Sequence, residues 1–120
     1  MPDNSVSLSG RRDLHAVLEQ VRIDFVQRLK IQLRQLQSIR AQIVTPGCDD
    51  DLRELEFIAH KINGLAKTLG FQSLGDAAES LEVAIASLEL HPRVSDPSEV
   101  VRLLDALVLK IRTTCAGAQD

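Results

Sequence analysis

The sequence predicts an all-α protein, an antiparallel up-down bundle of four helices with a possible extra helix at its N-terminus. Three observations lead to this prediction. Apolar residues recur at spacings of three, four and seven along most of the chain, which is the period of an amphipathic helix. Residues that begin or end helices divide these stretches into segments. The connections are short and no strand pattern appears, so successive helices should pack as antiparallel neighbours.

The first helix is expected over residues 9–44, after a flexible tail at residues 1–8. Its apolar stripe consists of Leu14, Leu18, Val21, Phe25, Leu29, Leu33, Leu36 and Ile43. The pattern does not decide between one long helix and two. The stretch TPGCDD at residues 45–50 contains a Pro-Gly turn and ends the segment. We take residues 9–120 as a single domain.

Two further helices are expected over residues 50–69 and 73–90. Gly70 stands where a glycine commonly ends a helix, and His91-Pro92 ends the later segment. The third helix has an apolar stripe of its own, formed by Leu74, Ala77, Ala78, Leu81, Ile85 and Leu88. The second helix has an apolar arc centred near Ile62, formed by Leu52, Leu55, Ile58, Ala59, Ile62, Leu65, Ala66 and Leu69. Both segments therefore carry one face suited to a core.

The stretch DPSE, residues 96–99, marks the start of the last helix. Asp96 is the expected N-cap, Pro97 the first helical residue and Glu99 the third, which is the spacing of a capping box. Its apolar positions are Val100, Leu103, Leu104, Leu107, Val108 and Ile111. This segment completes the set of four helices.

Composition excludes several classes of function. The 120 residues are 44% hydrophobic and 26% charged, with three Phe and no Tyr or Trp, so the core must be aliphatic. A net charge of −3 argues against a nucleic-acid binder. No apolar run is long enough for a membrane span, and the polar start lacks a signal-peptide core. Cys48 and Cys115 fit a reduced cytoplasmic protein, although a disulfide remains open.

His60 is the candidate functional residue on the second helix. At 100° per residue, it lies about 160° from the centre of the apolar arc, on the outer face. Gly64 lies one turn later on that face, where a glycine costs about 1 kcal/mol relative to alanine. Phe57 also points outward, so the two residues suggest a flat landing area for another protein. The plainer readings are a surface histidine, a glycine fixed by drift and a phenylalanine covered by its neighbours.

The stretch AHKINGLAKTLGFQSLGDAAESLE, residues 59–82, resembles the histidine phosphotransfer (HPt) domains of bacterial phosphorelays. It is similar also to the phosphotransfer domain of chemotaxis histidine kinases. The residues that match the family pattern in order and spacing are Ala59, His60, Ile62, Gly64, Ala66, Leu69 and Gly70. This motif covers about a fifth of the chain, and the number and length of the helices agree over the rest. Where the family usually has a lysine that contacts the phosphoryl group, this chain has Asn63.

The resemblance implies a phosphocarrier that is not itself an enzyme. His60 would accept a phosphoryl group, and Glu82 would hold the other imidazole nitrogen. The expected partners are response-regulator receiver domains and a sensor histidine kinase, with Mg²⁺ in the receiver and no cofactor in this chain. The expected oligomeric state is a monomer. The remaining site residues are expected to support the phosphoryl group (Lys67, Asn63 and Lys61) or to dock the partner (Phe57, Gly64 and Phe71).

The chemistry of imidazole agrees with this function. A neutral imidazole is a nucleophile near physiological pH, and a phosphoryl group on its nitrogen leaves readily. Transfer between proteins requires an exposed nitrogen and room for the partner. Lys67 shares the outer face with His60 and could offer positive charge, although an ordinary solvated lysine is the plainer reading.

Three other functions stay open. A helical adaptor, or a degenerate HPt module, would bind a kinase or receiver without carrying phosphate. A metal protein is a weaker alternative, because Glu56 and His60 could share a ligand face while His15 and His91 lie on other segments. An independent enzyme is the least favoured, because the sequence has no nucleotide-binding loop and no nucleophile paired with a base.

Overall fold

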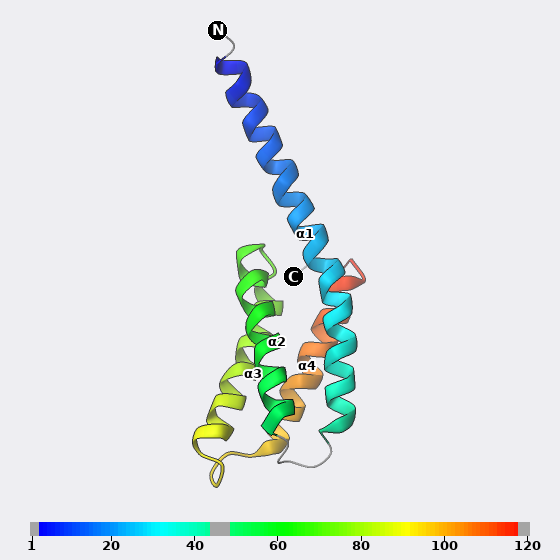
Figure 1. Cartoon of the computed structure of the whole chain (residues 1–120), viewed down its shortest axis with the longest axis vertical. Helices are drawn as coiled ribbons and strands as arrows, with labels where there is room; N and C mark the ends of the chain where they lie inside the picture. The colour runs from blue at the N-terminus through cyan, green and yellow to red at the C-terminus, as the bar shows by residue number, and fades with distance from the viewer. Residues whose placement is uncertain (1–2, 44–48, 118–120) are drawn as a thin grey trace.

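The structure is a computed structural model that describes residues 3–43 and 49–117, with side chains described for 13–43 and 50–117. This part of the chain forms an all-α bundle (Figure 1). Its helices are α1 (Asp3–Gln42), α2 (Asp49–Thr68), α3 (Gln72–Leu90) and α4 (Pro97–Cys115). The predicted fold class is therefore confirmed, and the long first segment is one continuous helix. The start of α1 at Asp3 corrects the expected start at residue 9, whereas the mobility of residues 1–8 stays a prediction.

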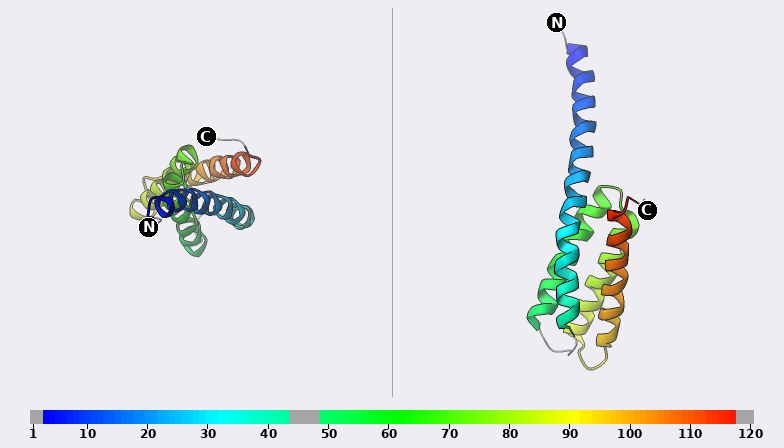
Figure 2. Two further views of the ribbon diagram at one scale, coloured as in Figure 1. Left: turned by 90° about the horizontal axis from the view of Figure 1, so that it is seen from above. Right: turned by 90° about the vertical axis from the view of Figure 1, so that its right-hand side faces the viewer.

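The helices pack in a ring, in which α1 and α3 each lie between α2 and α4 (Figure 2). Each helix contributes buried side chains at alternating spacings of four and three residues. These positions on the last three helices are Leu55, Ala59, Ile62 and Ala66; Leu74, Ala78, Leu81 and Ile85; and Val100, Leu104, Leu107 and Ile111. Such spacing keeps one seam of each helix facing its neighbours, as in most four-helix bundles.

The seam of α1 contains one polar residue. Its buried positions are Phe25, Leu29, Gln32, Leu36 and Ile39, and Gln32 is only 7% exposed. Its side-chain oxygen Oε1 is buried and has no hydrogen-bond partner among the described residues. A buried amide oxygen without a partner is costly, so this position calls for an explanation.

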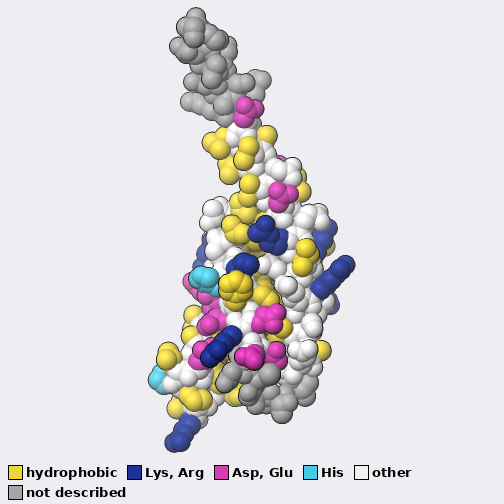
Figure 3. All heavy atoms as spheres, viewed as in Figure 1, with side chains coloured by type: hydrophobic (Ala, Val, Ile, Leu, Met, Phe, Trp, Pro, Cys, Tyr) yellow, Lys and Arg dark blue, Asp and Glu magenta, His cyan; other side chains and the backbone are white. Residues whose placement is uncertain are grey.

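Only the second half of α1 belongs to the bundle. At 1.5 Å per residue, its 40 residues span about 60 Å, whereas the other helices reach about 30 Å. Residues 13–21 are all exposed, and the first buried residue is Phe25. Hydrophobic side chains are visible along the projecting part (Figure 3). Leu14, Leu18 and Val21 belong to the apolar stripe expected on this helix but lie outside the core, because the other helices are too short to cover them.

The helix ends agree closely with the sequence signals. Gly70 has a φ of +90°, and the N–H groups of Phe71 and Gly70 donate to the carbonyls of Ala66 and Lys67 at 2.8 and 3.3 Å. This pair of bonds is a Schellman motif, which requires a residue with positive φ. The turn brings the chain directly from α2 into α3, which places the two helices that carry the site side by side.

The start of α4 confirms half of the expected capping box. The Asp96 carboxylate accepts a hydrogen bond from the backbone N–H of Ser98 at 3.0 Å, as an N-cap does. Glu99, however, binds Arg102 one turn later instead of reaching back to the N-cap. The reciprocal bond of the capping box is thus replaced by an ion pair along the helix.

Only one of the two cysteines lies among the described residues. Cys48 lies outside the described residues, and Cys115 is a half-buried free thiol. Burial raises the pKa of Cys115, partly offset by the positive charge of Lys30. No helix in the described part of the chain is long and apolar enough to cross a membrane.

Candidate functional site: an exposed histidine on α2

His60 projects from the outer face of α2. Its side chain is 75% exposed, whereas Ala59 and Ile62 on either side of it are fully buried. The helical period separates these residues in this way, because core positions recur every three to four residues. The backbone that carries His60 is therefore anchored by core residues, while the imidazole is accessible to another protein.

Glu82 of α3 holds one nitrogen of that imidazole. Nδ1 of His60 lies 3.0 Å from Oε2 of Glu82, and the Glu82 side chain is only 21% exposed. A carboxylate accepts hydrogen bonds, so it favours the tautomer that carries the proton on Nδ1. The lone pair of a neutral His60 is then on Nε2, which is the nucleophilic nitrogen.

Asn63 shares the same carboxylate. Its amide nitrogen Nδ2 donates to Oε1 of Glu82 at 3.2 Å, so both oxygens of Glu82 are engaged by α2. We expected Asn63 to face a phosphoryl group on His60, but its side chain binds Glu82. The oxygen Oδ1 of Asn63 is buried without a partner among the described residues. The sequence feature that could have indicated the contact with Glu82 is the i, i+3 spacing of His60 and Asn63, which puts both side chains within reach of α3.

Gly64 leaves open space one turn after His60. A Cβ added there would meet no atom within 4 Å, so packing does not require the glycine. Phe57, one turn before His60, is 60% exposed. The Lys61 ammonium lies 4.7 Å from the centre of the Phe57 ring, which is a cation–π contact. The outer face of α2 thus presents an aromatic ring and a bare backbone on either side of the histidine.

Lys67 is engaged elsewhere on α3. Its ammonium lies 3.2 Å from Glu79 and 3.6 Å from Asp76, and the hydrogen bond to Glu79 is the main reason why the pKa of Lys67 is raised. Gly75 makes room for the lysine stem, because a Cβ there would lie 2.6 Å from Lys67 Cγ. The amine that we expected to serve the phosphoryl group is therefore paired with two carboxylates.

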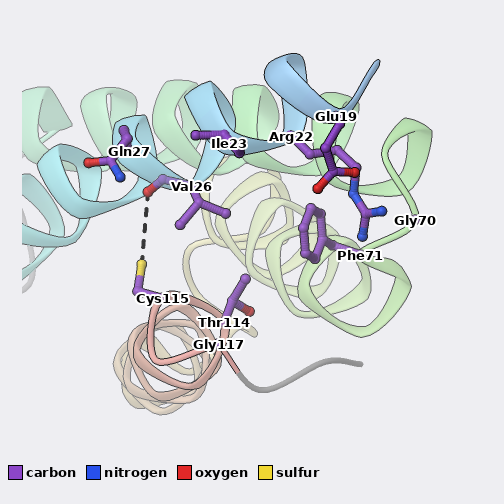
Figure 4. A pocket seen from close by; sticks show the side chains of 10 residues that line it. All are labelled: Glu19, Arg22, Ile23, Val26, Gln27, Gly70, Phe71, Thr114, Cys115 and Gly117. Carbon is purple, nitrogen blue, oxygen red and sulfur yellow. Dashed lines mark hydrogen bonds between the residues drawn. The ribbon is translucent and has the colours of Figure 1, made fainter. Parts of the chain in front are cut away.

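Phe71 does not lie on the outer face of α2 beside His60. It is 9% exposed, its ring centre is 5.6 Å from that of Phe25, and the Arg22 guanidinium covers it at 5.1 Å. The ring lines a hollow near the C-terminal end of α4, which Thr114 and Cys115 line from the α4 side (Figure 4). The volume of this hollow is about 380 Å³. The expectation that Phe71 docks a partner is corrected, because the turn after Gly70 directs its side chain into the core.

Two hollows flank His60. One of about 340 Å³ lies between α1 and α2 and is lined by Phe25, Arg28, Gln32, His60, Lys61, Gly64 and Leu65. The other, of about 370 Å³, is lined by Arg53, Glu56, Phe57, His60 and Glu82. Sequence reasoning missed Arg28 and Gln32, because nothing in the local spacing of α1 relates it to His60. Among the residues with described side chains, no three His, Cys, Asp or Glu residues are grouped to hold a metal ion.

Comparison with known protein families agrees with this geometry. The Hpt domain family model matches residues 20–114, which includes all of α2 and α3 and nearly all of α4. Searches of curated proteins and of solved structures gave no match. The match begins within the exposed part of α1, shortly before its first buried residue. Because it covers most of the chain, this protein belongs to the Hpt domain family.

Proposed function

We propose that this chain is a phosphorelay intermediate that carries a phosphoryl group on Nε2 of His60. Membership of the Hpt family places it in histidine phosphotransfer of two-component signalling, as a phosphocarrier module. The observation that carries the finer proposal is the exposed imidazole whose Nδ1 is held by Glu82. In this proposal the group comes from, or passes to, an aspartate of a response-regulator receiver domain in the cytoplasm.

The transfer needs no proton to leave the site. The Nε2 lone pair attacks the phosphorus of an aspartyl phosphate, the phosphorus–oxygen bond breaks, and the aspartate carboxylate leaves with the electron pair. The proton on Nδ1 stays, so the product is a phosphoimidazolium whose positive charge Glu82 offsets. In the reverse step the phosphorus–nitrogen bond breaks, and its electrons return to Nε2.

The partner supplies what this chain does not. In the proposal, Mg²⁺ and most of the stabilisation of the phosphoryl charge belong to the receiver domain. The open space over Gly64 and the exposed ring of Phe57 give that domain a surface on which to dock. Lys61 lies on this surface. A role for Lys67 stays a prediction, since its ammonium would have to leave Asp76 and Glu79.

One observation favours a second candidate, a non-catalytic adaptor that binds a kinase or receiver without carrying phosphate. The position before Gly64 holds Asn63, which binds Glu82 and brings no positive charge to His60. The docking surface would serve this function equally well. Only a covalent label on His60 separates the two candidates.

The deciding experiment is to incubate the chain with a panel of ³²P-labelled receiver domains and follow the label. We expect acid-labile label on the native chain and none on the His60→Gln variant, with both proteins equally helical by circular dichroism. His15→Gln and His91→Gln are matched controls that should still be labelled. Label that survives His60→Gln contradicts the assignment, and a native chain that no receiver or kinase labels favours the adaptor.

A further inference from the structure

We propose that the hollow between α1 and α2 holds the phosphoryl group carried by His60, and that Arg28 of α1 supplies its positive charge. This inference rests on the proposed function and adds a binding site to it. It assigns a role in the chemistry to the first helix, which the motif around His60 does not include.

His60 lines this hollow, whereas the other hollow beside it is lined by Glu82 itself. Nδ1 is bound to Glu82 on α3 at 3.0 Å. The two ring nitrogens lie on different edges of an imidazole, so Nε2 is turned away from Glu82. α2 packs between α3 and α1. The hollow that His60 shares with Arg28 is lined by residues of α1 and α2 only. A phosphoryl group on Nε2 therefore extends toward the space beside Arg28.

Three of the other polar residues near His60 are already engaged, and Arg53 borders the other hollow, which the carboxylates of Glu56 and Glu82 also line. Asn63 binds Glu82, Lys67 binds Glu79 and Asp76, and Lys61 lies over the ring of Phe57. Arg28 takes part in none of the ion pairs found among the described residues. Its long side chain ends in a planar group that can donate two hydrogen bonds to one phosphoryl group.

The hollow is also lined by a buried polar side chain whose oxygen has no hydrogen-bond partner among the described residues. Gln32 lies one turn after Arg28 in the core seam of α1, is 93% buried, and its Oε1 has no partner among the described residues. Rotation of this amide would turn its NH₂ group toward an anion. An aliphatic residue would pack better in this seam, so the polar side chain is explained if the hollow receives a polar group.

A test that needs no partner protein uses phosphoramidate, a small phosphoryl donor, to load His60. The pKa of the bound phosphoryl group is then followed by ³¹P NMR. A nearby guanidinium favours the more negative form, so we expect Arg28→Ala to raise this pKa by about half a unit to one unit. Arg28→Lys should restore part of the shift. Arg34→Ala removes an exposed arginine of the same helix that does not line the hollow, and it should change nothing.

The outcomes separate the two proposals. If every variant is labelled on His60 and Arg28→Ala leaves the phosphoryl pKa unchanged, the role of Arg28 is overturned while the phosphocarrier function stands. If the native chain takes no label from phosphoramidate or from any receiver, both proposals fail. Equal melting curves for Arg28→Ala and Arg34→Ala show that the shift does not come from a loosened helix. Transfer from a phosphorylated receiver should slow several-fold in Arg28→Ala alone.

Discussion

The Glu82 carboxylate joins α3 to the outer face of α2 by binding Nδ1 of His60 at 3.0 Å. Its second oxygen accepts a hydrogen bond from Asn63, so residues of α2 hold both carboxylate oxygens. A fixed carboxylate holds the ring at a set angle, and in the proposed transfer it offsets the charge that appears on the ring. The geometry of the site therefore depends on two helices together.

Replacing Glu82 should slow phosphoryl transfer without unfolding the bundle. A hydrogen bond to a charged group contributes about 1.5–3 kcal/mol, so we expect Glu82→Ala to lower the transfer rate by about 10- to 100-fold. Glu82→Gln keeps a hydrogen-bonding group, so its transfer rate should lie between those of the native chain and of Glu82→Ala. Glu79→Ala, one turn earlier on the same helix, breaks only the surface pair with Lys67 and is the control. Stopped-flow transfer from a labelled receiver measures all three, and equal losses for Glu79→Ala and Glu82→Ala would contradict the role of Glu82.

Asn63 should act as a positioning residue for Glu82. Asn63→Ala removes the bond to Glu82 but also removes the buried oxygen that has no partner, so the free energy of unfolding should change by less than about 1 kcal/mol. Transfer should nevertheless slow, because the carboxylate loses its second anchor. Asn63→Lys brings a positive charge close to His60 and should speed transfer above the native rate. The same transfer assay measures these rates. If Asn63→Ala transfers at the native rate, Asn63 does not position Glu82.

Gly64 should serve docking and not folding. Because a Cβ there meets no atom within 4 Å, Gly64→Ala should raise the free energy of unfolding by up to about 1 kcal/mol. Gly64→Gln should fold normally and slow transfer, since its side chain fills the space that the partner approaches. Glu54→Gln, an exposed position on the same helix, is the matched control and should transfer at the native rate. Chemical denaturation and the transfer assay test both statements, and a destabilised Gly64→Ala would show that the glycine is packed.

Asp96 should make the stability of α4 depend on pH. The hydrogen bond from Ser98 lowers the pKa of Asp96, so its charged form is favoured in the folded state. The resulting stability is fully present above the ordinary aspartate pKa and is lost as pH falls through the lowered folded value. Asp96→Asn keeps a capping side chain without a titrating group and should show a weaker loss over the acid range below the ordinary aspartate pKa. Thermal melts across this range compare the two, and identical pH profiles would assign the acid sensitivity to other carboxylates.

The sequence predicted the helices well because each of them carries its own period and its own end signals. Gly70 and Asp96 both act as expected, since a positive φ and an N-cap depend on residues close in the chain. The projecting part of α1 could not be predicted, because Leu14 and Leu18 have the same spacing as Phe25 and Leu29. What distinguishes them is the length of the neighbouring helices, which is a property of the whole bundle.

The site was predictable in part for the same reason. The outward direction of His60 follows from the helical period, and the resemblance to a known family pointed to Glu82. The contact of Asn63 with Glu82 and the position of Arg28 depend on how α2 packs against α3 and α1. Phe71 was misplaced because the turn at Gly70 reverses the chain, and a turn changes the direction of every side chain that follows it.

The unequal coverage of α1 gives a single helix two levels of local stability. Beyond the bundle its backbone hydrogen bonds are protected only by the helix itself, and an isolated helical segment of this length is marginal in water. Within the bundle the same kind of bond opens only when packed side chains around Leu29 and Leu36 separate. Amide hydrogen exchange should therefore change from rapid to slow near Phe25, within a helix that has no break in its backbone.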